Sequence, residues 1–496
     1  MGYEGNDDSV RAIPFGWSES TLDGIADHCL GKMLDEGKQR PGVRMPYLRN
    51  INVRWGAFDL ADLLEMPFEA HEHPRYGVED GDLIICEGGE PGRCAVWRGG
   101  DTELKIQKAL HRVRFRDGHV PEFFAYQLRW LVDQQLLSKF FTGTTIKHLP
   151  GVALKRIPFR YPEPSVQRRI VARIDELFGE IEAGERELAA AKVDLGRYRR
   201  AVLKAAVTGE LTCDWREQNQ PNDTGADLLA RILEERRARW ENAERAKFAA
   251  KGQTPKNDGW KSRYPEPVVP TTDDLPELPE GWTWASIDQL TVRVTKGSSP
   301  NWQGFEYQDH GVLFVRSQNI GWGELLLDDR AYLAAGFNEK EPRSVLAEGD
   351  VLLNIVGASI GRAAVATAEL SGANTNQAVA GIRPVRPDPL SDLICIALIA
   401  PPVQVLIHSQ KVDVARANLS LEQIRALPIA LPNEAEVRAL SSAVSATVEC
   451  GGELSEAIEV AAQDMARVRQ AILSSAFNGK LVGATDRVQA SVRDIV

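Results

Sequence analysis

The sequence predicts an α+β fold made of two similar globular halves, joined by two long antiparallel helices of the coiled-coil type and related by a pseudo-two-fold internal repeat. A heptad pattern follows the first half, the same pattern returns 270 positions later, and matching motifs precede both copies. The chain of 496 residues is also longer than one hydrophobic core accommodates.

These features predict seven segments along the chain. In order they are an unordered tail (1–12), a first globular domain (13–162), a first long helix (163–212), a charged helix with a linker (213–277), a second globular domain (278–432), a second long helix (433–483) and a C-terminal tail (484–496). The first globular domain reads as short strands and turns, with one amphipathic helix expected from Pro121 to Phe141.

The first heptad pattern lies between Ser165 and Leu211. Its apolar positions advance in alternating steps of four and three residues, the spacing that packs one helix against another. They are Ile170, Ile174, Leu177, Ile181, Gly184, Leu188, Ala191, Leu195, Tyr198, Val202 and Ala205. At about 1.5 Å per residue this seam is roughly 54 Å long, so the helix is expected to act as a spacer as well as a core element.

A charge-rich helix is expected after the first long helix, from Ala226 to Ala250, with Asp223 or Thr224 as its N-cap. The stretch from Lys251 to Pro279 is rich in Pro, Lys and Asp and has no periodicity, which is typical of a linker.

The second half repeats the motifs of the first. The matched residues are Gly16-Trp17 with Gly281-Trp282, Arg49 with Arg316, Asn52 with Asn319, Trp55 with Trp322, and Gly81-Asp82 with Gly349-Asp350. The offset between copies grows from 265 to 270 through the globular half and then stays constant along the helix. A rigid spacer would impose that constraint on the helix and leave the globular loops free to change length.

The second heptad pattern has the same phase as the first. Its positions are Leu440, Val444, Thr447, Gly451, Leu454, Ile458, Ala461, Met465, Val468, Ile472 and Ser475. Both patterns end alike, in RYRRAVLKAAVTGEL and RVRQAILSSAFNGKL, each with a Gly suited to a left-handed C-cap. Two like units related by a pseudo-two-fold axis make the two helices antiparallel partners.

Composition excludes several classes of protein. The six cysteines are scattered without a paired spacing, so a reducing compartment is expected. The N-terminus does not combine a basic start with an apolar run, and the most apolar window, Leu393 to Ile407, is interrupted by Pro401 and Pro402 and too short to span a bilayer. A cytoplasmic location without membrane contact is expected.

No catalytic, cofactor or metal site is predicted. The chain contains no phosphate-binding P-loop and no N-P-P or D-P-P methyltransferase motif, and His71-Glu72-His73 has no recognisable third ligand. An enzyme with an unrecognised site in one half is an alternative, but a duplicated active site should repeat its acid or base. Only Asp82 and Asp350 do so, and both look like turn residues.

Basic and amide side chains gather at matching places in the two halves. Phosphates favour cations, and base edges are read by Arg, Lys, Asn and Gln. The candidates in the first half are Arg49, Asn50, Asn52, Arg54, Arg93, Lys105, Gln107, Lys108, Thr142, Thr144, Thr145 and Lys147. Those in the second half are Arg316, Gln318, Asn319, Ser359, Arg362, Asn374, Asn376, Gln377, Arg416 and Asn418. Each alone is equally compatible with a solvated loop, but as a recurring set they favour a binding face.

The motifs together resemble the specificity subunits of type I restriction-modification enzymes, from Ile13 to Val482. The likeness rests on the two Gly-Trp openings, the two helix ends, and three runs of the second half: GDVLLNIVGASIGRAAV from Gly349, NTNQAVAGIRP from Asn374 and NLSLEQIRALPIALPNEAEVRAL from Asn418. The first half departs from this pattern, with EGGEPGRCAVW from Glu87 and KIQKALHRVRF from Lys105.

The resemblance implies that each globular half is a target recognition domain that reads one part of a bipartite site in double-stranded DNA. It also implies that the helix pair sets the unread gap and docks two modification (methyltransferase) subunits, which restriction/translocase subunits join. S-adenosylmethionine, ATP and Mg are then expected on the partner subunits and none of them on this chain. The alternative is a structural adaptor with two heads that bind other ligands, which would show no salt-dependent DNA binding.

Overall fold

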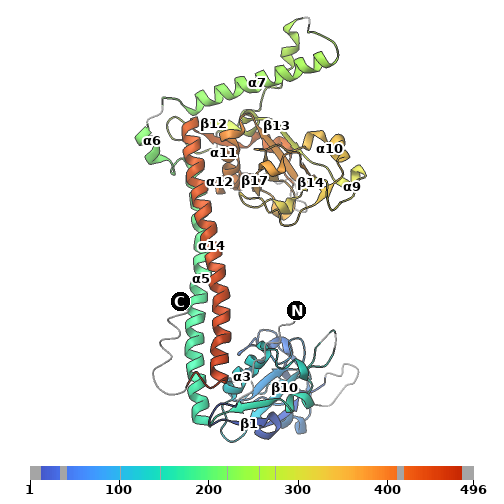
Figure 1. Cartoon of the computed structure of the whole chain (residues 1–496), viewed down its shortest axis with the longest axis vertical. Helices are drawn as coiled ribbons and strands as arrows, with labels where there is room; N and C mark the ends of the chain where they lie inside the picture. Colours follow the sequence, from blue (N-terminus) through green and yellow to red (C-terminus); the bar gives the residue numbers. More distant parts are fainter. Residues whose placement is uncertain are drawn as a thin grey trace, which may run out of the picture. The chain divides into compact units, whose positions relative to one another are not determined.

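The computed structural model describes residues 13–33, 42–100, 102–143, 145, 147–219, 222–255, 257–273, 275–409 and 418–482. They fall into two compact units. The first contains the described residues up to Ala190 and from Ile458 onward, and the second runs from Ala191 to Ala457. Each unit holds one globular head and a stretch of both long helices (Figure 1).

The first head is built on a 4-stranded antiparallel sheet in the order β2-β10-β7-β8. Its strands are β2 (Ala26–Leu30), β10 (Leu110–Phe115), β7 (Leu83–Cys86) and β8 (Cys94–Val96). A 3-stranded sheet, β6-β3-β9, and two strand pairs, β1-β11 and β4-β5, complete the head. These strands are β6 (Leu64–Phe68), β3 (Val43–Leu48), β9 (Lys105–Ile106), β1 (Ser18–Thr21), β11 (Pro158–Tyr161), β4 (Val53–Arg54) and β5 (Ala57–Phe58).

The second head repeats both sheets and the closing strand pair, whereas β4-β5 is matched among its described residues only by an isolated bridge between Ile320 and Leu325. The 4-stranded sheet is β13-β19-β16-β17, the 3-stranded sheet is β15-β14-β18, and the closing pair is β12-β20. Their bounds are β13 (Thr291–Lys296), β19 (Val379–Pro384), β16 (Val351–Asn354), β17 (Ala363–Val365), β15 (Tyr332–Leu333), β14 (Val312–Val315), β18 (Asn374–Thr375), β12 (Thr283–Ser286) and β20 (Pro428–Leu431). Even the parallel pair β3-β9 recurs, as β14-β18.

One helix packs on the 4-stranded sheet of each head. It is α3 (Pro121–Asp133) in the first and α11 (Pro387–Ile399) in the second. α3 stops short of the expected end at Phe141, because Gln135 adopts a positive φ of 57°. The shorter helices are α1 (Leu22–Ile25), α2 (His73–Tyr76), α4 (Gly151–Lys155), α6 (Cys213–Asn219), α8 (Ile287–Leu290), α9 (Pro300–Gln303), α10 (Gly336–Lys340), α12 (Pro401–Ser409) and α13 (Leu421–Ala426).

Within the described residues, no single helix is long and apolar enough to cross a membrane. α11 and α12 meet that criterion only as a pair, and they are bent by 66° at their junction. The break falls just before Pro401, where the sequence predicts an interruption. α11 itself is part of the buried core of the second head.

The two long helices are α5 (Pro164–Thr208), of 45 residues, and α14 (Glu434–Phe477), of 44 residues. In the first unit Gly184 lies against Met465, and in the second unit Gly451 lies against Leu195. Arg469 also lies over the Phe178 ring in the first unit, and Thr212, just beyond α5, donates to Glu436 in the second. Within each unit the contact positions therefore fall along α14 as they rise along α5, so the helices are antiparallel. Together with the duplicated heads, this confirms the predicted fold class.

The expected glycine caps are present at the helix ends. Gly209 and Gly479, each just beyond a long helix, have φ of 78° and 72°. The heptad seam itself is unevenly buried. Ile174 and Leu440 are inaccessible or nearly so, whereas Tyr198 and Leu454 are 58% and 49% exposed. Two helices cover a seam residue from one side only, so side chains far from a head keep part of their surface in solvent.

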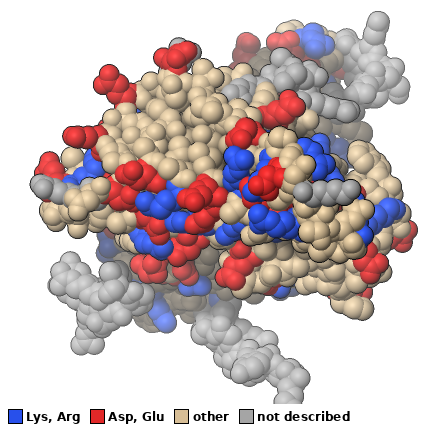
Figure 2. Space-filling view, turned by 90° about the horizontal axis from the view of Figure 1, so that it is seen from above, with Lys and Arg blue, Asp and Glu red and all other residues tan. Residues whose placement is uncertain are grey.

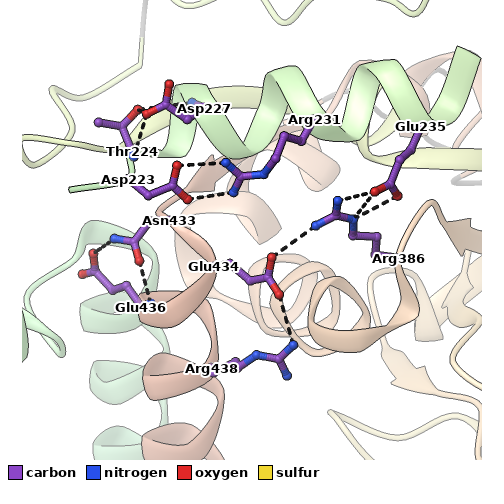
Figure 3. Close-up of polar contacts among 10 residues, drawn as sticks. All are labelled: Asp223, Thr224, Asp227, Arg231, Glu235, Arg386, Asn433, Glu434, Glu436 and Arg438. Carbon is purple, nitrogen blue, oxygen red and sulfur yellow. Dashed lines mark hydrogen bonds and ion pairs between the residues drawn. The ribbon is translucent and has the colours of Figure 1, made fainter. Parts of the chain in front are cut away.

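α7 (Gly225–Ala250) is the expected charge-rich helix, and its N-cap is Thr224. The Thr224 hydroxyl accepts a hydrogen bond from the backbone N–H of Asp227, and the Asp227 carboxylate accepts one from the N–H of Thr224 (Figure 3). Of the two candidate caps, Asp223 instead pairs with Arg231 at 2.7 Å. This capping box fixes where the helix begins.

A chain of charges anchors α7 to the second head and to the start of α14 (Figure 3). Arg386, just before α11, donates from Nε to the carboxylate of Glu235 at 2.9 Å and from Nη1 to Glu434 at 3.2 Å. Glu434 also accepts a hydrogen bond from Arg438 at 3.1 Å. One guanidinium thus joins α7 and the first turn of α14.

The segment expected to be a linker is partly folded onto α7. Trp260 stacks on Trp240 with ring centroids 5.9 Å apart, and Tyr264 packs edge-on against Trp240 at 5.4 Å. Trp260 is 7% exposed and Tyr264 is 9% exposed. Part of the segment predicted to be a linker therefore packs on α7, because its two aromatic side chains bury apolar surface there.

A buried carboxylate with a bonded arginine holds together the turn before the third strand of each 4-stranded sheet. Asp82 is 0% exposed and accepts from Arg114 Nε and Nη2, both at 2.8 Å, and from the N–H of Glu79 at 2.7 Å. Asp350 repeats this arrangement with Arg383. Asp82 and Asp350 thus cap a turn, as expected, and also form a bidentate ion pair that no sequence pattern indicated.

We expect Asp82→Ala to lower the free energy of unfolding by about 2 to 4 kcal/mol, because the substitution leaves Arg114 without its buried partner. Urea unfolding of the full chain measures the change. Asp27→Ala is the matched control, since Asp27 pairs with Arg116 at the surface and should cost less than about 1 kcal/mol. Equal losses in the two variants would contradict a structural role for the buried pair.

Candidate nucleic-acid interface

One edge of the 4-stranded sheet brings four loop segments of the first head together. Leu30 ends β2, Cys86 ends β7 and Leu110 begins β10, and the register aligns His111 with Leu30 and Leu110 with Cys86. The residues beyond these strand ends therefore leave the sheet on the same side. We call this side the loop edge; its described residues are 31–33, 87–92, 105–109, 142–143, 145 and 147–148.

Backbone hydrogen bonds tie these segments to one another. The N–H of Leu149 donates to Glu87 O at 2.7 Å, and Gly88 pairs with His148 in an isolated bridge. The N–H of Lys108 donates to Lys32 O at 2.8 Å. The loops of the first head therefore form a connected surface.

The second head has the same edge, made of residues 297–299, 355–361, 374–378 and Asn418. The N–H of Leu419 donates to Ile355 O at 3.0 Å, and Val356 pairs with Asn418, as their counterparts do in the first head. The exit of β13 runs so close to β18 that a Cβ on Gly297 would lie 1.7 Å from Thr375 O. Only glycine permits that approach.

Nine of the described candidates lie on the loop edges with exposed or half-exposed side chains. They are Gln107, Lys108, Thr142, Thr145 and Lys147 in the first head, and Ser359, Asn376, Gln377 and Asn418 in the second. Two others lie beside an edge: Asn50, whose amide is close to the Gly89 turn, and Arg362, three residues after Ser359. Thr144 and Arg416 lie outside the described residues.

The repeated asparagines are structural, so their prediction as base readers is corrected. Asn52 is 2% exposed; its Nδ2 donates to Asp59 O at 2.9 Å and Asp62 O at 3.0 Å, and its Oδ1 accepts from the N–H of Arg49. Asn319 is equally buried and makes the same set of bonds. Every polar atom of the amide is used inside the head, and none is left for a base edge.

The repeated arginines belong to the same loop. Arg49 Nη2 lies 2.7 Å from Asp62 Oδ2, and Arg316 Nη2 lies 3.0 Å from Asp329 Oδ2. Their side chains are 22% and 19% exposed. The repeat of arginine and asparagine therefore marks a loop in each head that is closed by its own hydrogen bonds.

The remaining candidates also have partners inside the chain or are buried. Asn374 is 0% exposed and donates to Asn338 and to Glu341 O, and Lys105 is 5% exposed. Arg93 donates to Asn50 O at 2.9 Å, Arg54 lies 3.5 Å from Asp59, and Gln318 donates to Asp329. Burial lowers the pKa of Lys105 from its ordinary value. In this arrangement these residues support the loops, and a direct role in recognition stays a prediction for those that keep exposed surface, such as Arg54.

Charge outside the loop edges is mixed. On the face drawn in Figure 2, basic and acidic side chains interleave in a band and do not form a patch of one sign. Along α7 the charges pair with each other, as in Arg245 with Glu241 at 3.2 Å. The loop edge of the first head carries exposed Lys108 and Lys147 together with Glu87 and Glu90. Within the described parts of the chain, no cluster of His, Cys, Asp and Glu is arranged to hold a metal ion, and Glu72 of the His71-Glu72-His73 run pairs with Lys32.

A histidine pair that the sequence analysis missed braces the loop edge of the first head. His111 is 0% exposed, and its Nε2 donates to Leu149 O at 2.9 Å. Its Nδ1 therefore accepts from His28 Nε2, also at 2.9 Å. Burial lowers the pKa of each ring to about 4, and for His28 the neighbouring His111 adds to the effect. Both rings are therefore neutral at pH 7. The hydrogen bond between them requires that His111 Nδ1 carry no proton, because it accepts the proton of His28 Nε2.

The pair makes the fold sensitive to acid. Because the folded pKa values lie below the ordinary value of 6.5, the unfolded chain takes up protons first, and stability present above pH 6.5 is lost as the pH falls toward 4. We expect a loss of about 2 to 3 kcal/mol between pH 7 and pH 5.5 that is absent in the double variant His28→Gln with His111→Gln. Urea unfolding at pH 7 and 5.5 measures it, with the exposed His71→Gln as control. An equal acid response in all three proteins would contradict this role.

The architecture defines a class of protein: two copies of one α+β head, each with its own loop edge, on a pair of antiparallel helices. No family model matches the chain. Among curated proteins, it is 21% identical to the type I restriction enzyme EcoBI specificity subunit of Escherichia coli over 481 residues, 96% of this chain and 89% of that protein. It is 26% identical to the EcoDI specificity subunit of Escherichia coli over 222 residues, 42% of this chain and 40% of that protein.

Solved structures share the fold over nearly the whole chain. One, from a study of complex assembly and conformational transition of the type I R-M system, has a TM-score of 0.64 at 17% identity and covers 95% of this chain and 99% of its own. The HsdS subunit from Thermoanaerobacter tengcongensis has a TM-score of 0.52 at 18% identity, with 94% and 98% covered. The resemblance to type I specificity subunits that the motifs predicted is confirmed.

Proposed function

We infer that this chain is the DNA sequence-recognition subunit of a type I restriction-modification complex and has no catalytic activity of its own. The observation that carries this conclusion is the duplicated loop edge: among the described residues, the bonds of Leu149 to Glu87 and of Gly31 to Leu110 recur as Leu419 to Ile355 and Gly297 to Val379, on two heads whose edge residues differ. The similar curated proteins are specificity subunits. None of the comparisons supports the alternative of an adaptor that binds other ligands.

The two edges present different side chains on one framework. Gln107 and Lys108 of the first head occupy the positions of Asn376 and Gln377 in the second, since the N–H of Gln107 donates to Leu48 O as that of Asn376 donates to Val315 O. A shared framework gives both heads one way of approaching DNA, and different side chains give them different base preferences. Each head therefore reads its own part of a bipartite site in double-stranded DNA.

The helix pair sets the distance between the two parts of the site. α5 is continuous for 45 residues, about 68 Å at the rise of an α-helix. Both helices keep the same heptad phase, so neither can gain or lose a residue without turning its apolar face away from the other. The number of unread base pairs is therefore constant for this chain.

The half-exposed heptad residues provide a surface for partner subunits. Tyr198, Leu454 and Val468 keep 58%, 49% and 41% of their surface in solvent. We propose that two modification (methyltransferase) subunits cover such residues and that restriction/translocase subunits join them. S-adenosylmethionine, ATP and Mg would then be bound by those subunits in the cytoplasm, and this chain would contribute the DNA sequence preference.

Shortening both helices by one heptad tests the spacer role. Removing residues 188–194 and 454–460, which lie between the Gly184–Met465 and Gly451–Leu195 contacts, shortens the pair by about 10 Å and keeps the seam in phase. We expect the gap in the methylated site to shrink by about three base pairs while the specified bases stay the same. Genome-wide methylation mapping, after co-expression with the modification subunit, measures the gap, and an unchanged gap would contradict the spacer role.

Substitutions of Gln377 and Asn319 test recognition and folding separately in the second head. Gln377→Ala should relax discrimination at one base position by about 1 to 3 kcal/mol and leave stability unchanged, because the side chain is exposed. Asn319→Ala should lower the free energy of unfolding by about 2 kcal/mol and leave the methylated motif the same, because it removes a buried set of hydrogen bonds. Methylation mapping and urea unfolding report the two effects, and an unaltered motif in Gln377→Ala would count against its position at the interface.

A further inference from the structure

Trp302 is a large apolar side chain left in solvent beside the loop edge of the second head. It lies in α9 and is 79% exposed. Single exposed apolar side chains are common, so exposure alone carries little weight. The setting of this side chain, and what is bonded to the helix that carries it, are more informative.

Hydrogen bonds hold the helix that carries Trp302 in place. Gln303 Nε2 donates to Ser298 Oγ at 3.0 Å and to Glu341 Oε1 at 2.7 Å. The Gln303 carbonyl accepts from Lys340 Nζ at 2.8 Å. The residue next to the indole is therefore fixed on three sides. A side chain presented on such a frame loses little freedom when it binds.

The same bonds connect α9 to the candidate base-reading segment. Glu341, whose carboxylate holds Gln303, accepts at its carbonyl from Asn374 Nδ2 at 3.1 Å. Asn374 begins the segment that carries Gln377 at the loop edge. From the other side, α9 follows Gly297, which is pressed against Thr375. Trp302 is thus attached to the loop edge at two points.

We propose that Trp302 packs its indole against the DNA, on a base or a deoxyribose of the half-site read by the second head. This inference rests on the proposed function and adds a contact to it. In a duplex the base faces are covered by their stacked neighbours, so an indole packs on the apolar surface of a deoxyribose or of a base edge, such as a thymine methyl. The contact strengthens binding while the amides at the edge supply the sequence preference.

The contact is apolar and belongs to the second head alone. The run from Asn301 to His310 contains no Lys or Arg and includes Glu306 and Asp309, so it does not attract phosphates. In the first head, the residues after β2, from Gly31 to Pro41, include no aromatic residue. Loss of the indole should therefore weaken binding without changing how binding depends on salt.

The test uses the full chain co-purified with its modification subunits and a DNA duplex that contains the mapped site. For Trp302→Ala we expect the Kd to rise about tenfold, with the same motif and the same slope of log Kd against log salt concentration. Trp302→Phe should keep most of the affinity, since it retains an aromatic face. Lys147→Ala provides the contrast, because loss of a phosphate contact lowers the salt slope by about one.

Phe15→Ala is the matched control for loss of an exposed aromatic ring, since Phe15 is fully exposed in the first unit and lies outside its loop edge. Its Kd should equal that of the unaltered chain. An unchanged Kd for Trp302→Ala, or loss of the modification subunits from that variant during purification, would overturn the inference while leaving the proposed function in place. Failure of the unaltered complex to bind any mapped site would contradict both the inference about Trp302 and the proposed function.

Discussion

The phase of the heptad seam is the constraint on which the rest of this molecule depends. In each unit a side chain of one long helix lies against a glycine of the other, Met465 against Gly184 and Leu195 against Gly451. Gain or loss of one residue in either helix rotates every later side chain by about 100° and takes the apolar face out of the seam. This requirement explains why the offset between the repeats varies through the heads yet stays at 270 along the helices. The heads are free to diverge, but the helices are not.

In each head the residues that stabilise the fold and the residues that can differ between heads lie at opposite ends of the 4-stranded sheet. The buried Asp82–Arg114 pair and its copy, Asp350–Arg383, hold the turn at one end of the sheet. The loop edge at the other end shares its backbone bonds between heads and differs in side chains. A rigid frame with variable edge residues lets two heads of one design prefer different bases, because recognition depends on side chains held at defined positions.

Much of the fold was predictable because its signals are periodic or local. The heptad seam, the capping glycines Gly209 and Gly479 and the break before Pro401 follow from spacing and residue type. The fold-back of Trp260 onto Trp240 was not predictable, because it depends on a contact between segments with no shared period. For the candidate site, repetition misled: Asn52 and Asn319 recur because the loop needs them, and a repeat preserves structural residues as faithfully as binding ones. Trp302 was missed for the converse reason, since it has no counterpart in the first half.

The central claim is that two heads of one chain read two separated parts of a single DNA site. The most direct measurement is the map of methylated genomic positions in cells that express this chain with its modification subunit, compared with cells that express the modification subunit alone. The account predicts one motif that appears only with this chain and has two specified parts separated by a constant number of unspecified base pairs. A continuous motif, a variable gap, or methylation that does not depend on the chain would contradict it.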